Sequence, residues 1–218
     1  MAKKKKKLDK YQWIQLYKDY FLQHGELVPS AKELATFADS EWVDLKMEFN
    51  NLQQLEAALV LLYFKQANEL LVADEKFEHY SSKEKHLAFL YVLTEKIGVD
   101  ELFLSDFLHK KRLDPGFIMQ VLKLVNSQEL DWTTTEGWAK GTLDKINFHP
   151  KKTALINHAL GCLTFYLKDT SEEKQDTDAF IEKTTDLLFK LTDTSTLHSA
   201  MDLGKFLFSR RKTAFSWD

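Results

Sequence analysis

Apolar residues recur at helical spacing along most of the chain. Residues 11–23, for example, place Ile14, Tyr17 and Phe21 on one stripe, and steps of three and four residues define one face of an α-helix. No segment alternates between apolar and polar residues for long enough to form a strand. The pattern therefore predicts an all-α protein.

Several of the expected helices carry start and stop signals. Ser30 stands directly before an apolar-periodic segment, with Glu33 three residues later, which is the arrangement of a capping box. Gly25 follows the first segment, as a C-terminal cap would. Between residues 128 and 148 the periodicity weakens, and we expect a loop or an irregular helix there. The expected helices cover residues 11–23, 31–37, 40–47, 50–72, 82–97, 99–109, 116–126, 150–168, 172–191 and 195–211.

The composition suits long helices in a chain without a membrane span. Seven Gly and three Pro among 218 residues are few chain breakers, which disfavours a fold with many turns. The longest uninterrupted apolar run, residues 57–64, is far shorter than the roughly 20 residues of a spanning helix. No apolar stretch follows the basic residues 3–7, so they are not a secretory signal. Because the single Cys162 cannot form an internal disulfide, we expect a cytoplasmic protein.

The first third of the chain carries an ordered set of apolar and glycine positions. An aromatic residue precedes a glycine by four residues, a Leu-Ala pair lies in the next helix, and further apolar positions lead into a long helix. In this ungapped register, residues 11–59 resemble the DNA-binding domain of TetR-type repressors. A generic three-helix cap on a helical bundle would need the same apolar positions. The matching positions are Phe21, Gly25, Leu34, Ala35, Ala38, Leu45, Phe49 and Leu55.

The resemblance to the TetR family implies a division of the chain into three parts. Residues 1–9 would form a basic N-terminal tail, residues 10–56 a helix-turn-helix domain, and residues 57–218 a helical ligand-binding and dimerisation domain. In this family the last two long helices pair across a two-fold axis. Here residues 150–168 and 172–191 are the candidates, so the resemblance implies a homodimer.

The expected recognition helix departs from the family pattern in its charge. Glu41 and Asp44 would face the DNA groove, and the family usually has Gly where Asp39 stands. Residues 9–72 hold five lysines against ten acidic residues. The whole chain has a net charge of −3, so its overall charge does not indicate a DNA-binding protein. The basic residues 3–7 are either an arm along the DNA or a solubilising tail. The candidate DNA contacts are Lys3, Lys4, Lys5, Lys6, Lys7, Lys32, Trp42 and Lys46.

Aromatic residues are frequent in the expected ligand domain. A pocket between helices with such a lining would bind a hydrophobic small molecule or a lipid tail, whereas the alternative is an ordinary core. Two of the tryptophans lie in the weakly patterned segment and are the best candidates for pocket or lid residues. The candidate ligand-binding residues are Phe103, Phe107, Trp132, Trp138 and Phe165.

Motifs for catalysis or metal binding are not found in the sequence. It has no G-x-S-x-G, no glycine-rich phosphate loop and no H-E-x-x-H. His158 and Cys162 are spaced i, i+4 on one expected helix face, but two ligands do not make a metal site. We therefore expect a non-enzymatic protein without a metal or cofactor.

Two hypotheses about function remain. The first is a TetR-like homodimeric transcriptional regulator with a hydrophobic small-molecule pocket in its C-terminal domain. The second is a TetR-like fold that has lost DNA binding and acts as a lipid-binding, small-molecule-binding or protein-interaction protein. The acidic recognition helix is the feature that favours the second hypothesis.

Overall fold

The computed structural model describes residues 7–111, 114–133 and 150–192. Within these ranges the regular structure consists of α-helices and short 3₁₀ turns, as the periodicity predicts, and no strand occurs. The expected helix 195–211 lies outside the described residues. The helices are α1 (Lys10–His24), α2 (Ala31–Phe37), α3 (Trp42–Glu48), α4 (Leu52–Val72), α5 (Ser82–Gly98), α6 (Glu101–Lys111), α7 (Pro115–Asn126), α8 (Pro150–Tyr166) and α9 (Gln175–Thr192). The 3₁₀ turns are η1 (Glu75–His79), η2 (Asp131–Thr133) and η4 (Glu172–Lys174).

Local capping explains where the first helices begin and end. The side chain of Asp9 accepts a hydrogen bond from the backbone N–H of Gln12 at 2.8 Å, which satisfies a free donor of the first turn of α1. Gly25 ends α1 in the left-handed region at φ +67°, where a side chain would be strained. Ser30 caps α2 by accepting from the N–H of Glu33 at 3.2 Å. The predicted C-cap Gly25 and N-cap Ser30 are therefore confirmed, whereas the reciprocal bond of a capping box forms at α1 and not at α2.

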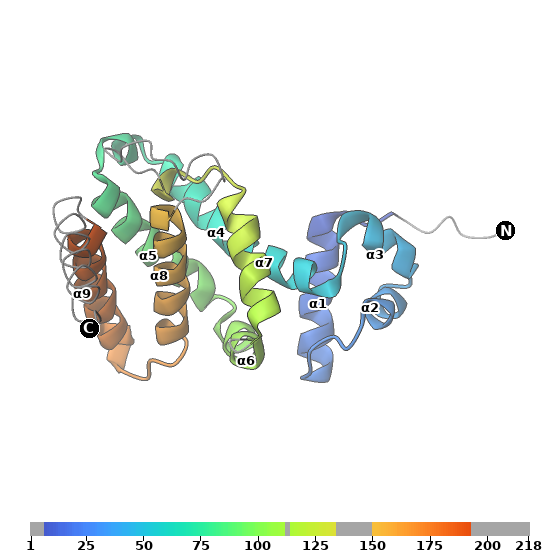
Figure 1. Cartoon of the computed structure of the whole chain (residues 1–218). Coiled ribbons are helices and arrows are strands. Elements are labelled where there is room, and N and C mark those ends of the chain that lie inside the picture. The colour runs from blue at the N-terminus through green and yellow to red at the C-terminus, as the bar shows by residue number, and fades with distance from the viewer. Residues whose placement is uncertain (1–6, 112–113, 134–149, 193–218) are drawn as a thin grey trace, which may run out of the picture.

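Helices α1, α2 and α3 form a small unit at the N-terminal end of the molecule, and α4 leaves this unit to enter the rest of the chain (Figure 1). We call α1–α3 the N-terminal unit and the elements from the middle of α4 onward the body. The predicted domain boundary between residues 56 and 57 falls inside α4, which is one continuous helix. Both parts therefore share a rigid element.

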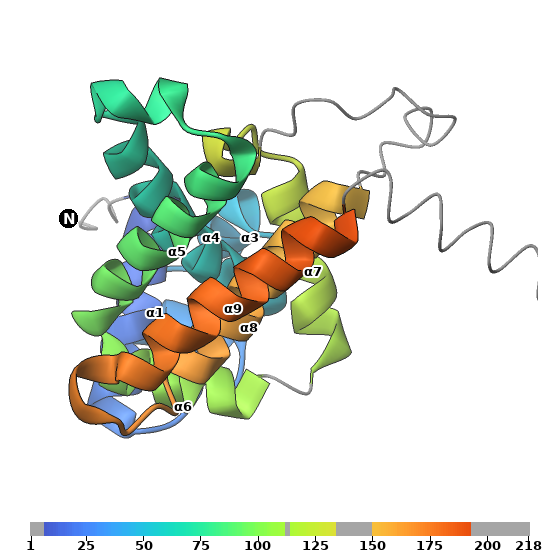
Figure 2. The same cartoon turned by 90° about the vertical axis from the view of Figure 1, so that its left-hand side faces the viewer.

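The body is a bundle around α4 and α5. Helix α4 packs against α5 on one side and α7 on the other, and α8 and α9 cover α5 (Figure 2). Most side chains of α4 are buried, which agrees with its apolar composition nearly all round. None of the helices in the described ranges is long and apolar enough to cross a membrane.

The segment before α9 differs from the expected single helix over residues 172–191. It forms the 3₁₀ turn η4, with Glu173 and Lys174 at positive φ, and α9 begins at Gln175. The Lys174 ammonium donates to Glu101 at 2.6 Å and to the carbonyl oxygen of Asp169 at 2.9 Å. These tertiary contacts hold the backbone in a conformation that local helical periodicity does not encode.

Candidate functional site

The N-terminal unit exposes one face of α3. Leu34 and Ala35 of α2 and Leu45 of α3 are buried together, so the opposite side of α3 points away from the unit's core. Val43 and Met47 lie on that side, with Met47 67% exposed, and Trp42 at the start of α3 is exposed as well. This arrangement of two short helices over α1 has the geometry of a helix-turn-helix unit (Figure 1).

The candidate DNA contacts that are described all lie on the surface. Lys7 precedes α1, Lys32 lies on α2, and Trp42 and Lys46 lie on α3, and each is exposed. The Lys46 ammonium lies 4.7 Å from the centre of the Trp42 ring, which is a cation–π contact. Residues 3–6 lie outside the described residues.

Acidic side chains surround these candidate contacts. Glu41 is exposed at the start of α3, and Asp44 accepts a hydrogen bond from the Ser40 hydroxyl at 3.2 Å. Asp39 is in the left-handed region at φ +48°, a conformation that glycine adopts without strain. The surface around α3 is therefore acidic in the structure, as the sequence predicts.

The candidate ligand residues lie mainly in the core. Phe103 and Phe107 on α6 are buried, and their rings stack with centres 5.6 Å apart. Trp132 on η2 is fully buried, whereas Phe165 on α8 is half-buried and stacks on Phe180 of α9 at 4.3 Å. Trp138, the fifth candidate, lies outside the described residues. Burial by itself does not distinguish a ligand pocket from a core, so these assignments remain predictions.

An aromatic cluster surrounds His86 in the interior of the body. The Trp132 ring stacks on Phe89 with 3.8 Å between ring centres, and Phe64 meets both rings edge-on. His86 is fully buried and lies 5.5 Å from the Trp132 ring. Sequence reasoning missed His86, although it falls on the same helical stripe of α5 as Phe89 and Leu90. That stripe is the signal that could have identified it as buried.

His86 begins a row of hydrogen-bonded side chains. Its Nε2 lies 2.9 Å from Nδ1 of His158 on α8, and Nε2 of His158 lies 2.8 Å from the hydroxyl of Thr184 on α9. Burial, aided by the nearby His158, lowers the pKa of His86 to about 3, and burial also lowers the pKa of His158. The Cys162 thiol lies 3.5 Å from His158, and burial raises the pKa of that thiol to about 11. Both imidazoles are therefore neutral at neutral pH, and the thiol is not ionised.

A different polar cluster joins the N-terminal unit to the body. The hydroxyl of Tyr17 on α1 donates to the buried carboxylate of Glu56 on α4 at 2.7 Å, and the ammonium of Lys111 on α6 lies 2.8 Å from the same carboxylate. Burial first, and then the charge of Glu56, raise the pKa of Tyr17 far above its ordinary value. We call Tyr17, Glu56 and Lys111 the junction triad.

A second junction contact centres on Asp100, which precedes α6. Its carboxylate accepts from the ammonium of Lys18 on α1 and from the hydroxyl of Tyr63 on α4, both at 2.6 Å. Burial pushes the pKa of Asp100 upward, but the hydrogen bonds from Lys18 and Tyr63 outweigh it and leave the pKa below its ordinary value. Both junction clusters thus tie α1 to the body through paired charges.

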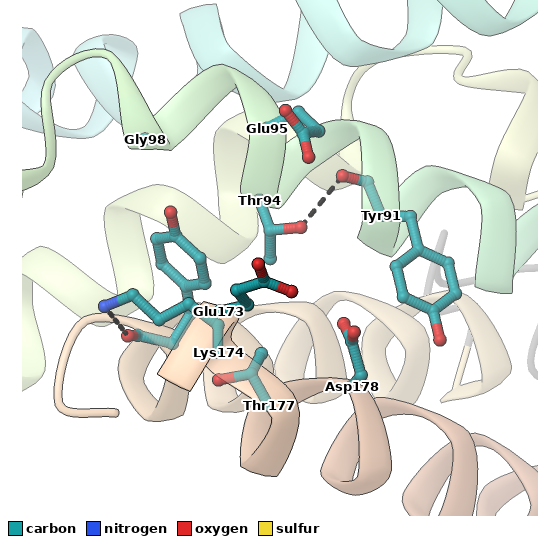
Figure 3. Close-up of a pocket in the computed structure, with 9 residues that line it drawn as sticks. Tyr91, Thr94, Glu95, Gly98, Glu173, Lys174, Thr177 and Asp178 are labelled. Atoms are coloured by element: carbon teal, nitrogen blue, oxygen red, sulfur yellow. Dashed lines mark hydrogen bonds between the residues drawn. The ribbon is translucent and has the colours of Figure 1, made fainter. Parts of the chain in front are cut away.

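A polar cavity of about 270 Å³ lies where α5, the end of α8 and the start of α9 meet (Figure 3). Among the described lining residues the cation is Lys174, which is paired with Glu101 and with backbone carbonyls, so the remaining charged side chains of the lining are acidic. This chemistry does not suit a hydrophobic ligand, and none of the four described candidate ligand residues lines the cavity. Its lining residues are Tyr91, Thr94, Glu95, Gly98, Tyr166, Glu173, Lys174, Thr177 and Asp178.

A second cavity, of about 200 Å³, is mainly apolar and lies between α7 and α8. The candidate residue Phe107 does not line it but contacts Phe117, which does, with ring centres 5.7 Å apart. Its lining residues are Leu108, Phe117, Ile118, Val121, Asn157, Leu160, Gly161 and Thr164. Over the described ranges, no group of three His, Cys, Asp or Glu side chains gathers as metal ligands would.

Comparison with known proteins places the second half of the chain in a described family. A family model described as "Tetracyclin repressor-like, C-terminal domain" matches residues 85–207, which is more than half of the chain. No curated protein and no solved structure matches the sequence. The matched span begins within α5 and lies entirely after residues 11–59, so it is independent of the helix-turn-helix pattern in the N-terminal unit.

Proposed function

The chain belongs to the tetracyclin repressor-like family, and on that premise we propose that it is a homodimeric, non-enzymatic transcriptional regulator that responds to a hydrophobic small molecule. One observation carries the proposal. A family-matched body is joined, through the continuous helix α4, to a three-helix unit that exposes its third helix. This is the arrangement by which a ligand-binding domain can position a DNA-reading head.

The proposed DNA contacts come from α2, α3 and the basic N-terminal segment. Trp42 and Lys46 on α3 would reach base edges or phosphates, and Lys32 together with residues 3–7 would contact the DNA backbone. The acidic Glu41 and Asp44 oppose phosphate approach, so binding would be weak and would depend strongly on salt concentration.

The proposed ligand site lies among the aromatic side chains of the body. The apolar cavity between α7 and α8 supports this proposal, because a cavity with a hydrophobic lining is the kind of space that such a ligand needs. A ligand that shifts α6 or α7 would act on the N-terminal unit through α4, which packs against α7, and through the junction triad. Ligand binding would thereby change the spacing of two reading heads.

We propose that α8 and α9 form the dimer interface. Leu187 and Leu191 lie one turn apart on α9 and are both more than half exposed. Charge introduced by Leu187→Glu would convert the dimer to a monomer in light scattering, whereas Met119→Glu, at an exposed position of α7, would leave the mass unchanged.

An electrophoretic shift assay with genomic DNA fragments over a series of salt concentrations tests the regulator. We expect retarded fragments at low salt and a steep loss of binding as salt increases. A complete lack of binding at low salt would overturn the DNA-binding part of the proposal.

The acidic α3 surface favours a second candidate function. On this alternative the protein has lost DNA binding and acts as a lipid-binding, small-molecule-binding or protein-interaction protein, and the exposed Val43 and Met47 would contact a partner. Native mass spectrometry of freshly purified protein tests the lipid form of this alternative. A bound lipid together with no DNA shift would favour it over the regulator.

A further inference from the structure

The hydrogen bonds of the histidine row fix the direction of its protons. The Thr184 hydroxyl donates to the carbonyl oxygen of Phe180 at 2.6 Å, because a carbonyl oxygen can only accept. Its single proton is then used, so the Thr184 oxygen accepts from Nε2–H of His158. A neutral His158 carries no second proton, and its Nδ1 must accept from Nε2–H of His86.

This direction leaves an acceptor at the end of the row. Neutral His86 donates through Nε2, so its Nδ1 carries only a lone pair. That atom is buried and has no hydrogen-bond partner. Buried side-chain nitrogens without a partner are uncommon in native proteins, since losing hydration without replacement costs free energy.

Complementary unpaired groups lie beside it. The indole nitrogen of Trp132 is a donor, is buried and has no partner, and its ring lies 5.5 Å from the His86 ring. The hydroxyl of Thr185 on α9 is also buried and unpaired, and it shares a helix face with Phe189, whose ring lies 6.0 Å from His86. One unpaired acceptor and two possible donors are therefore carried by side chains of neighbouring elements of the body.

Aromatic side chains surround these atoms, and one of them, Trp132, belongs to a short 3₁₀ turn. The rings of Phe64, Phe89 and Trp132 pack against one another beside His86. Trp132 belongs to the single 3₁₀ turn η2, which Asn68 holds through two hydrogen bonds to Asp131 at 2.9 and 3.0 Å. Moving a single turn disrupts far fewer contacts than moving a helix, so Trp132 is the part of this wall that can give way to a ligand.

We propose that His86 Nδ1 and the Trp132 indole N–H form the polar anchor of the ligand site in the body, and that the ligand is an aromatic or aliphatic molecule with a hydroxyl group. This inference rests on the proposed function, since it names the chemistry of the ligand. The hydroxyl oxygen accepts from Trp132, and its proton is donated to His86 Nδ1, so one group satisfies both unpaired atoms. The aromatic wall contacts the apolar part of the ligand.

Isothermal titration calorimetry of the full-length protein with matched pairs of probes tests the anchor. The pairs are 1-naphthol with naphthalene and phenol with benzene, which differ only in the hydroxyl group. We expect the alcohol of at least one pair to bind at least about tenfold more tightly than its hydrocarbon, because the hydroxyl pairs two buried groups. His86→Phe removes the acceptor and should reduce this ratio to about one while the hydrocarbon still binds.

Two further variants keep the result interpretable. Trp132→Phe removes only the indole donor and should reduce the ratio even if His86→Phe does not fold. His79→Phe replaces an exposed histidine of η1 and should leave the ratio unchanged. Equal affinities within each pair, or a ratio that survives in His86→Phe and Trp132→Phe, would overturn the anchor and leave the proposed hydrophobic pocket standing. No binding of any probe would overturn the anchor, whereas the DNA assay decides separately on the regulator.

Discussion

Two polar regions of this molecule are buried to a similar degree but differ in how completely they are paired. In the junction triad, one buried carboxylate receives a tyrosine hydroxyl and a lysine ammonium from two other helices. In the histidine row, the bonds run in one direction and end on an unpaired nitrogen of His86. The buried charge of the first region is balanced within the protein by a hydroxyl and a cation, whereas the second region ends on a nitrogen that no group of the protein balances.

The difference separates a structural role from a binding role. A buried carboxylate that is matched by a hydroxyl and a cation holds its elements in one arrangement, because removing either partner leaves the charge uncompensated. A buried network with an unpaired end costs free energy, and a ligand that pairs with this end would remove that cost. We therefore assign the junction triad to the coupling of the N-terminal unit with the body, and His86 to ligand recognition.

The largest expected effect comes from breaking the junction triad. Lys111→Met leaves the buried carboxylate of Glu56 without its cation, and we expect the free energy of unfolding to fall by about 3 kcal/mol in urea denaturation. Lys83→Met, which breaks the exposed pair of Lys83 with Asp186, should cost less than about 1 kcal/mol. If both variants lost the same free energy of unfolding, the buried ion pair would contribute no more to stability than the surface ion pair.

The histidine row should make stability depend on pH. Unfolded His86 binds a proton near pH 6.5, whereas folded His86 does so only near its lowered pKa of about 3, so the unfolded state binds more protons between these values. The free energy of unfolding should fall on acidification from pH 7 to pH 5, by about 2 kcal/mol from His86 alone. Chemical denaturation at both pH values measures it, and His86→Phe should show a smaller fall. An unchanged fall in that variant would show that other groups cause it.

A smaller change, in DNA affinity, is expected from the exposed surface of the N-terminal unit, whose polar groups are not paired with the body. Glu41→Lys replaces an exposed negative charge at the start of α3, and binding to mixed-sequence DNA at low salt should strengthen roughly three- to tenfold. Fluorescence anisotropy measures this, with Glu78→Lys on the distant η1 as the control of equal charge. If both variants gain equally, the effect is one of net charge and not of α3.

The smallest expected effect concerns the backbone between α2 and α3. Asp39 adopts φ +48°, which glycine tolerates and alanine does not. Asp39→Gly should therefore be more stable than Asp39→Ala by about 1 kcal/mol in the same denaturation assay. Equal stabilities would mean that this part of the N-terminal unit is not strained, and that the acidic residue replaces glycine at no conformational cost.

The helices were predictable because their signals are local. The bounds of α2, 31–37, were predicted correctly, since Ser30 and the apolar positions Leu34 and Ala35 lie within a few residues of one another. The break before α9 was not predicted, because Lys174 is held there by Glu101, which is distant in the sequence. Local patterns cannot encode a bond that forms only when separate helices meet.

The candidate sites were predictable to different extents. Lys32, Trp42 and Lys46 were expected on the surface of a reading head, and the structure exposes all three, although no finding tests whether they bind DNA. The proposed ligand residues were chosen only as aromatic side chains, and periodicity cannot tell the lining of a pocket from a core. His86 was missed for the same reason, since a histidine on an apolar stripe looks like any other buried position.

The sequence by itself determined the all-α class, the short helices of the N-terminal unit and the acidic charge of its third helix, because caps, periodicity and charge are properties of neighbouring residues. Only the tertiary structure decided which polar groups are buried together. Tyr17, Glu56 and Lys111 come from three separate helices, and so do His86, His158 and Thr184. Whether such a group ends paired or unpaired depends on how those helices pack, and no local pattern specifies that.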